Sequence, residues 1–231
     1  MTKNRNIVLV HGAWTDGSGW HKVIPLLRSE GHSVSATQHP LTSLSDDVEI
    51  TRRLAEAQDG PTVLVGHSYG GAVITEAASQ CPHVAGLVYI AAFAPDAGEN
   101  LGDLGQRSEP APGNAAVHPD KYGMLWIDKD KFVESFCQDV AKEEAIVMAT
   151  VQKPIAIQCF TDKITNAGWK NLPCWYQVSE QDRMIAPGTE MFMAERMKPQ
   201  QRISLPAGHA SMVSYPKEIA GLILAACKFL K

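Results

Sequence analysis

The sequence predicts an α/β fold, in which a mostly parallel sheet of about six strands is flanked by helices. Two observations predict it. Short apolar runs alternate with segments of helical periodicity, and glycine, proline and small polar residues separate them. Strands that are apolar throughout are typical of a parallel sheet covered on both faces. The expected strands are residues 6–10, 33–37, 62–66, 84–91, 174–179 and 202–205.

Helical segments are expected between these strands. The segment 20–30 carries apolar residues on one face and is followed by Gly31, which is typical of a helix C-terminus. Apolar residues in 44–58 recur at nearly helical spacing until Gly60 and Pro61 end the pattern. The expected core helices are residues 20–30, 44–58, 72–79, 188–197 and 217–230.

Residues 95–154 interrupt the alternation of strand and helix. The segment opens with glycine, proline and aspartate, carries no strand pattern and becomes helical over 129–152. It contains enough apolar residues to bury a face of its own. An insertion after the carboxyl end of a strand lies over the site of an α/β sheet. We therefore expect a core of residues 1–94 and 155–231, with 95–154 as a small helical cap.

Length and charge limit the classes of function. A chain of 231 residues with 45% apolar residues fits one domain with a modest insertion. The net charge is −4, and no basic run is longer than Arg52-Arg53, which predicts neither nucleic-acid nor anionic-lipid binding. No apolar run reaches the roughly 18 residues of a membrane span. The four apolar residues before His11 are too few for a secretory signal. We expect a cytoplasmic protein without membrane association.

The cysteine pattern indicates neither a disulfide framework nor a metal site. The number of cysteines is odd, they are widely spaced, and no C-x-x-C pair occurs. We expect free, buried thiols and no bound metal, with a Cys159–Cys174 bridge as the alternative. The five cysteines are Cys81, Cys137, Cys159, Cys174 and Cys227.

The strongest chemical signal is G-x-S-x-G, written here as Gly66-His67-Ser68-Tyr69-Gly70. It lies directly after an expected strand and directly before an expected helix, which is the setting of a nucleophile elbow. A serine on such a sharp turn needs small neighbours two residues away. The turn exposes the serine hydroxyl and directs the next amide, that of Tyr69, toward a developing oxyanion. We predict that Ser68 is the nucleophile.

The end of the first strand provides a second signal. His11-Gly12 stops that strand, and the loop after it must approach the nucleophile to supply a second backbone donor. Ala13 follows Gly12 and is the expected donor. Two preorganised amides that face a developing negative charge lower the barrier to acyl transfer.

A serine nucleophile needs a base, and His209 fits best among eight histidines. It lies between the last expected strand and the last helix, at the carboxyl edge of the sheet. His11 and His67 flank the oxyanion loop and the elbow, and we expect them to shape the site without acting as the base. The remaining histidines lie away from the late-strand turns: His21, His32, His39, His83 and His118.

The base in turn needs a carboxylate that orients it. Asp182 lies in the turn after the strand 174–179 and gives the order Ser…Asp…His along the chain. Glu180 lies too near the end of that strand. Asp96 is the second candidate for the acid, and Asp162 the third.

These motifs resemble those of the α/β-hydrolase fold superfamily. The matching segments are the H-G-A loop, the G-H-S-Y-G-G elbow, S-E-Q-D-R-M-I and A-G-H-A-S-M. Together with the strand pattern, they cover nearly the whole chain. The opening V-H-G-A-W…G-S-G-W-H-K-V-I-P-L-L and the late D-R-M-I are most similar to the branch of plant methylesterases, hydroxynitrile lyases and small esterases. The resemblance implies Ser68, Asp182 and His209 as a catalytic triad, with the amides of Ala13 and Tyr69 as the oxyanion hole.

Three positions distinguish reactions within this superfamily. Haloalkane dehalogenases and soluble epoxide hydrolases carry aspartate as the nucleophile, where this chain has Ser68. Hydroxynitrile lyases carry a lysine directly after the catalytic histidine, where this chain has Ala210. Methylesterases carry a methionine three residues after that histidine, and Met212 matches it. The resemblance therefore implies hydrolysis.

The sequence thus predicts a serine hydrolase of small to medium carboxylic esters or lactones, without a cofactor. The alternatives are C–C bond hydrolysis, cofactor-free oxygen chemistry or lyase chemistry on the same triad, and a small-ligand receptor with low turnover. The surface helices carry no heptad pattern, so both a monomer and a homodimer remain open. Aromatic and sulfur-containing side chains are expected to line the pocket with His67: Trp14, Met124, Trp126, Phe136 and Met212.

Overall fold

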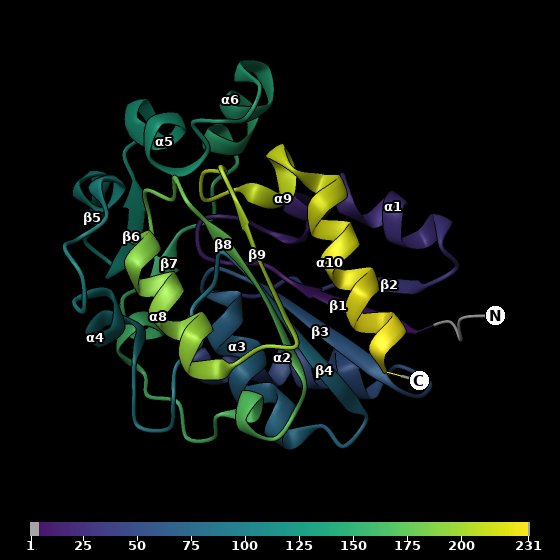
Figure 1. Ribbon diagram of the computed structural model, residues 1–231. Helices are drawn as coiled ribbons and strands as arrows, with labels where there is room; N and C mark the ends of the chain where they lie inside the picture. The colour runs from purple at the N-terminus through teal and green to yellow at the C-terminus, as the bar shows by residue number, and fades with distance from the viewer. Residues whose placement is uncertain (1–4, 231) are drawn as a thin grey trace.

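A six-stranded parallel sheet forms the centre of the computed structural model, which describes residues 5–230 (Figure 1). The strand order is β2-β1-β3-β4-β8-β9, and every neighbouring pair is parallel. The strands are β1 (Asn6–Val10), β2 (Ser33–Ala36), β3 (Thr62–His67), β4 (Val84–Ile90), β8 (Cys174–Ser179) and β9 (Gln201–Leu205). The predicted fold class is therefore confirmed.

The burial of the strands follows their place in the sheet. Every residue of β3 and β8 is buried, because helices cover both faces of these strands. The two edge strands, β2 and β9, contain polar as well as apolar residues and are partly exposed. The runs most apolar in sequence thus lie at the middle of the sheet, where a parallel strand has no solvated face.

Two layers of helices cover the sheet. Helices α1 (Val23–Ser29) and α10 (Pro216–Phe229) pack together on one face. The other face carries α2 (Leu44–Glu56), α3 (Gly70–Ala77) and α8 (Pro187–Met197). Right-handed crossovers explain this division, because the chain moves from β1 to β2 in one direction and through β3, β4, β8 and β9 in the other.

Two predicted helices are divided in the structure. Of the segment 20–30, residues 23–29 form α1, and Trp20 is the last residue of a preceding 3₁₀ turn, η1 (Gly17–Trp20). The segment 129–152 consists of α5 (Lys129–Phe136) and α6 (Lys142–Thr150), separated by a turn at 137–141. In that turn, the side chains of Gln138 and Asp139 bond to loops of the core, and these bonds replace the continuing helical pattern.

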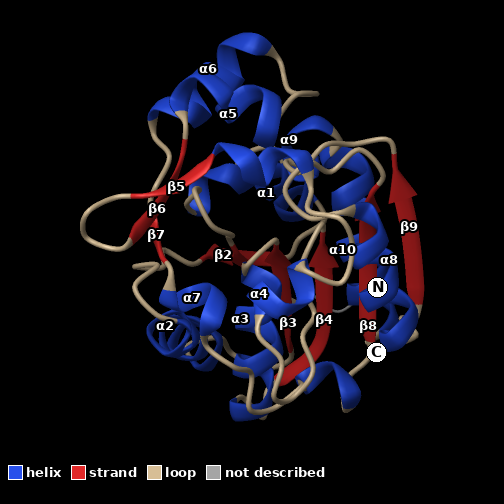
Figure 2. Ribbon diagram, turned by 90° about the vertical axis from the view of Figure 1, so that its left-hand side faces the viewer, coloured by secondary structure: helices blue, strands red, loops and turns tan. Residues whose placement is uncertain are grey.

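The segment after β4 contains strands that the sequence did not indicate. β5 (Val117–Pro119), β6 (Met124–Ile127) and β7 (Ile155–Ala156) form a small antiparallel sheet, separate from the central one (Figure 2). Strands this short show no alternation of apolar and polar residues that could be recognised in the sequence. They form by pairing with segments that are distant in the chain. β7 pairs with β6 across the boundary predicted at residue 155. The remaining elements here are α4 (Leu101–Gly105), η3 (Pro112–Ala116), α7 (Gln158–Thr161) and η4 (Gly168–Lys170); η2 (Ala78–Gln80) and α9 (Ser211–Ser214) belong to the core.

All five cysteines are buried and free in the described part of the chain. Within residues 5–230, no helix combines the length and the apolar character needed to cross a bilayer.

Candidate active site

Ser68 occupies a strained turn between β3 and α3. Its φ is +54°, in the left-handed region that non-glycine residues rarely adopt. The turn is tight because its glycines allow backbones to touch. A Cβ on Gly66 would lie 2.5 Å from the carbonyl oxygen of Gly70, and one on Gly70 would lie 2.6 Å from that of Val10. The local sequence thus forces the serine hydroxyl to the carboxyl edge of the sheet.

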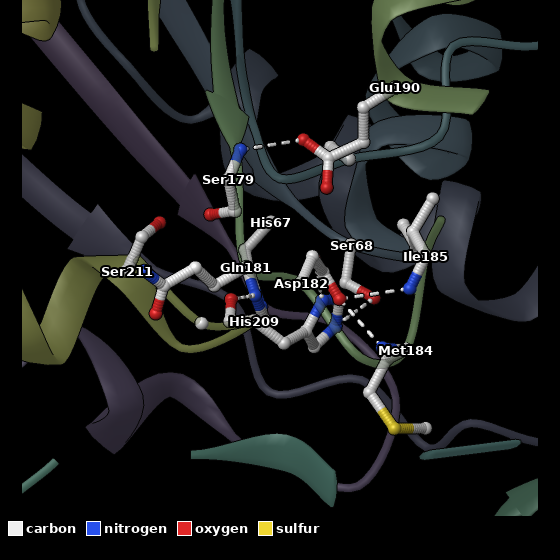
Figure 3. Close-up of polar contacts among 12 residues, drawn as sticks. His67, Ser68, Ser179, Gln181, Asp182, Met184, Ile185, Glu190, His209 and Ser211 are labelled. Atoms are coloured by element: carbon white, nitrogen blue, oxygen red, sulfur yellow. Dashed lines mark hydrogen bonds and ion pairs between the residues drawn. The ribbon is translucent and has the colours of Figure 1, made fainter. Parts of the chain in front are cut away.

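Ser68, His209 and Asp182 form a continuous chain of hydrogen bonds (Figure 3). The Ser68 Oγ lies 2.8 Å from Nε2 of His209, and Nδ1 of His209 lies 2.6 Å from Oδ2 of Asp182. The three side chains come from the turns after β3, β9 and β8. They are almost entirely removed from solvent, with exposed fractions of 4% for Ser68, 0% for His209 and 3% for Asp182.

Backbone amides hold the Asp182 carboxylate in place. Its Oδ1 accepts hydrogen bonds from the N–H groups of Met184 (2.7 Å) and Ile185 (2.9 Å). Burial opposes ionisation of Asp182, but the charge and hydrogen bond of His209, together with these amides, outweigh it and keep the pKa of Asp182 below its usual value. Asp182 is therefore an ionised acceptor for Nδ1–H of His209.

His67 packs against His209 and bonds to its backbone. Its Nε2 donates to the His209 carbonyl oxygen at 2.9 Å, and its ring lies against that of His209. Burial, reinforced by the neighbouring His209, lowers the pKa of His67 to about 3. The Phe136 ring packs edge-on against the His209 ring, with centroids 4.9 Å apart. Both residues therefore hold His209 in position.

The loop after β1 lies directly beside Ser68. A Cβ on Gly12 would lie 2.7 Å from Cβ of Ser68, so only glycine allows this approach. The His11 ring holds the loop: its Nδ1 donates to the Gly12 carbonyl oxygen and its Nε2 accepts from the His39 N–H, both at 2.9 Å. Burial lowers the pKa of His11 to about 4, so this ring is neutral.

The sequence predicts that the backbone amides of Ala13 and Tyr69 face an oxyanion. Both residues are buried, and neither amide donates a backbone hydrogen bond within residues 5–230. The Tyr69 side chain is anchored away from the site, because its hydroxyl donates to Oδ2 of Asp47 at 2.7 Å. Burial raises the pKa of Asp47 to about 6.

A cavity of about 370 Å³ opens beside Ser68. No ionised side chain lines it, and its polar side chains besides Ser68 are those of Gln106 and Asn114. Its other walls come mainly from the segment that follows β4 and from the turn after Asp182. The lining residues are Trp14, Ser68, Phe93, Leu101, Gly102, Gly105, Gln106, Pro110, Ala111, Asn114, Val117, Leu125, Phe160, Met184, Ile185 and Ala186.

Of the six residues predicted to line the pocket, Trp14 lies in the cavity wall and the other five do not. Side chains alternate along β6, so Leu125 faces the cavity while its neighbours Met124 and Trp126 do not. The indole N–H of Trp126 instead donates to Asp120. His67 and Phe136 pack around His209, as described above, and Met212 is buried near Gly19.

Two side chains in the turn between α5 and α6 bond to the loops that carry His209 and Asp182. Oδ2 of Asp139 accepts from the Gly208 N–H at 2.8 Å, and Nε2 of Gln138 donates to the Gln181 carbonyl oxygen at 2.8 Å. A third bond joins the segment after β4 to the loop after β1, where the Trp14 indole N–H donates to the Leu125 carbonyl oxygen at 3.0 Å. No local pattern in the sequence predicts these long-range bonds.

The alternative acids have other partners. Asp96 forms an ion pair with Lys170 at 2.6 Å, and Asp162 accepts from the Leu44 N–H. Glu180 is exposed. Across the described residues 5–230, no group of three or more histidine, cysteine, aspartate or glutamate side chains is arranged to hold a metal ion.

Comparison with known proteins places this geometry in context. The model of the alpha/beta hydrolase family matches residues 7–222. The carbendazim hydrolyzing esterase of Nocardioides sp. (strain SG-4G) is 27% identical over 95% of this chain and 98% of its own. Methylesterase 2 of Arabidopsis thaliana is 33% identical over 41% of each chain. The crystal structure of a pyrethroid hydrolase from Sphingobium faniae JZ-2 superposes with a TM-score of 0.85 at 22% identity, covering 97% of this chain and 98% of that one.

Proposed function

This chain belongs to the alpha/beta hydrolase family, and on that premise we propose that it cleaves small to medium carboxylic esters through an acyl-enzyme on Ser68. The relatives described above are esterases and hydrolases, and the protein is an ester hydrolase. The observation that carries this mechanism is the hydrogen-bond chain from Oγ of Ser68 through His209 to Asp182, with Ser68 in the wall of an apolar cavity.

In the first half-reaction, Nε2 of His209 takes the proton of the Ser68 hydroxyl while Oγ attacks the ester carbonyl carbon. The hydrogen bond from Nδ1–H to Asp182 fixes the tautomer that leaves Nε2 free to accept. The ionised Asp182 carboxylate stabilises the imidazolium that results. His209 then protonates the departing alcohol, and the acyl group stays on Ser68.

The amides of Ala13 and Tyr69 are the proposed donors to the oxyanion. Both amides lack a backbone acceptor in the described chain and flank Ser68, one from the loop after β1 and one from the start of α3. Donors that are already in place need no reorganisation when charge develops. In the second half-reaction, His209 activates a water molecule that attacks the acyl carbon and releases Ser68.

The cavity favours a neutral substrate. Its volume of about 370 Å³ and its apolar walls suit a small to medium acyl or alcohol group, and no ionised side chain is present to pair with a charged one. Lactones need the same machinery and belong to the same proposal. We also propose that residues 95–154, together with β7, act as the cap that shapes this cavity.

Replacement of the nucleophile tests the proposal. Ser68→Ala is expected to lower p-nitrophenyl acetate hydrolysis by at least about a thousandfold, because the remaining site offers only binding and oxyanion donors. A fluorophosphonate probe should label the wild-type protein on Ser68, as read by peptide mass spectrometry. Ser29→Ala, at the exposed end of α1, is the control and should keep both activity and labelling.

Activity retained in a folded Ser68→Ala protein would exclude this mechanism. A substrate panel of methyl esters, lactones and diketones separates ester cleavage from the alternative of C–C bond cleavage. Tight, stabilising ligand binding without turnover would instead indicate a receptor.

A further inference from the structure

Glu190 is a fully buried carboxyl group that the proposed reaction does not use. It lies in the first turn of α8, which packs against β8. Its Oε2 accepts a hydrogen bond from the N–H of Ser179 at 2.9 Å (Figure 3). Ser179 is the last residue of β8, and its carbonyl oxygen accepts from the Asp182 N–H at 3.2 Å. Glu190 therefore holds the start of the turn that presents Asp182.

The other oxygen of Glu190 has no donor of its own. No N–H or O–H group among residues 5–230 bonds to Oε1, although this atom is buried. Figure 3 shows the Glu190 carboxyl pointing toward the turn that carries Asp182, and the two carboxyl groups interact with each other. Two adjacent carboxyl groups in a buried site share a proton, because both cannot be ionised at once.

The surroundings decide which of the two carboxyls carries that proton. Asp182 accepts from Nδ1 of His209 and from two backbone amides, whereas Glu190 accepts one backbone amide. Hydrogen-bond donors stabilise the ionised form of a carboxyl. The negative charge therefore belongs on Asp182 and the proton on Oε1 of Glu190, which satisfies an otherwise unpartnered atom.

We propose that Glu190 is a protonated positioning residue, which donates a hydrogen bond from Oε1 to Asp182 and thereby fixes the acid that orients His209. The inference rests on the proposed roles of Ser68, His209 and Asp182. The proton stays on Glu190 throughout the reaction. Glu190 acts through Asp182 and touches neither substrate nor the reacting atoms.

The charges around Glu190 act in the same direction. Burial raises its pKa well above the usual value for glutamate, and the neighbouring Asp182 charge raises it further. The titratable groups that face it are Asp182, from the turn after β8, and Tyr176, from β8 itself. No basic side chain of the described residues forms an ion pair with Glu190.

The proposal has a direct spectroscopic test that needs no turnover. The Ser68→Ala protein and the Ser68→Ala/Glu190→Gln protein are compared at pH 8 by infrared difference spectroscopy. The wild-type side chain should contribute a carboxylic-acid C=O stretching band that Glu190→Gln lacks. A carboxylate band in its place would show that Glu190 is ionised and would overturn the proposal.

Two variants then test positioning in the otherwise wild-type enzyme. In Glu190→Gln, the amide can donate to Asp182 and accept from Ser179, so kcat should stay within about threefold of wild type. Glu190→Leu can do neither, and kcat should fall on the order of tenfold to a hundredfold at nearly constant KM, because small displacements of a catalytic group have effects of this size. Rescue by glutamine separates a hydrogen-bond donor from a volume requirement.

The His209 Nδ1 proton provides the accompanying readout. Its downfield proton resonance, which reports the bond to Asp182, should persist in Glu190→Gln and shift or broaden in Glu190→Leu. Wild-type kcat in Glu190→Leu, or equal loss in both variants, would overturn the proposal. If Glu190→Leu does not fold, as judged by circular dichroism, the infrared band and the glutamine variant still decide. Loss of the proposed function would appear separately, as activity retained in Ser68→Ala.

Discussion

The carboxyl edge of the central sheet and the segment after β4 position the residues of the candidate site in different ways. At the edge, Ser68, Asp182 and His209 lie on turns that directly follow β3, β8 and β9, so strand register sets their spacing. The segment after β4 contributes the cavity wall from short helices and strands, and it joins the edge through individual side-chain bonds. Backbone pairing thus fixes the proposed reacting groups, whereas the cavity wall depends on individual side-chain contacts.

The largest effect should come from the edge. Asp182→Asn keeps the shape of the side chain but loses the charge that selects the His209 tautomer, and kcat should fall about ten-thousandfold. Asp96→Asn, at the second candidate acid, should leave kcat within about twofold, because Asp96 pairs with Lys170. Steady-state kinetics on p-nitrophenyl acetate measures both. Equal losses in the two variants would contradict the assignment of Asp182.

A smaller effect should come from the bonds between the two regions. Asp139→Ala removes the acceptor for the Gly208 N–H, next to His209, and kcat should fall about tenfold, in line with the usual strength of a hydrogen bond to a charged group. Asp139→Asn keeps an acceptor and is the matched control, so it should remain near wild type. If both variants keep full activity, the bond contributes nothing to the position of His209.

Within the cavity wall, neighbouring residues of β6 should differ. Leu125→Ala enlarges the cavity and should shift the preferred acyl chain to a longer one, with a change in relative kcat/KM of about threefold to tenfold per added carbon pair. Trp126→Ala removes more volume from the same strand but outside the cavity, so the order of preference should not change. A p-nitrophenyl ester series from acetate to octanoate measures both. An equal shift in Trp126→Ala would show that the cavity wall is not the source of selectivity.

The smallest effect concerns stability and the elbow. The pKa of Asp47 is raised in the folded protein to about 6, so its contribution to stability is present at low pH and is lost as the pH rises through about 6. Asp47→Asn cannot ionise and can still bond to the Tyr69 hydroxyl. Its melting temperature relative to wild type should therefore rise by a few degrees between pH 4 and pH 7. Thermal scans across this range measure it, and a difference independent of pH would contradict the shifted pKa.

Prediction from sequence was most complete where structure is local. Local signals predict the structure of residues 62–77. They are an apolar run, glycines two residues from Ser68 and a helix of small residues, and each depends only on neighbours in the chain. The positions of Asp182 and His209 after late strands predict their place at the same sheet edge as Ser68. In the structure, Asp182 bonds to His209, and His209 bonds to Ser68.

Prediction was least complete in the segment after β4. β5, β6 and β7 are too short to show alternation, and pairing between distant residues creates them. A shift of one residue along β6 decides whether Leu125 or Trp126 faces the cavity, and no local signal fixes that register.

Glu190 shows the same limit. In sequence it looks like an ordinary acidic residue in the first turn of a helix, where exposed carboxylates are common. Only the packing of α8 on β8 buries it against Ser179 and Asp182.

Periodicity and steric limits between adjacent residues made the central sheet, the strained turn at Ser68 and the order Ser68, Asp182, His209 readable from the sequence. The cavity wall, the bonds from Gln138 and Asp139 to the loops that carry Asp182 and His209, and the burial of Glu190 appear only in the tertiary structure. These features depend on which distant surfaces meet, and that is set by the packing of whole elements.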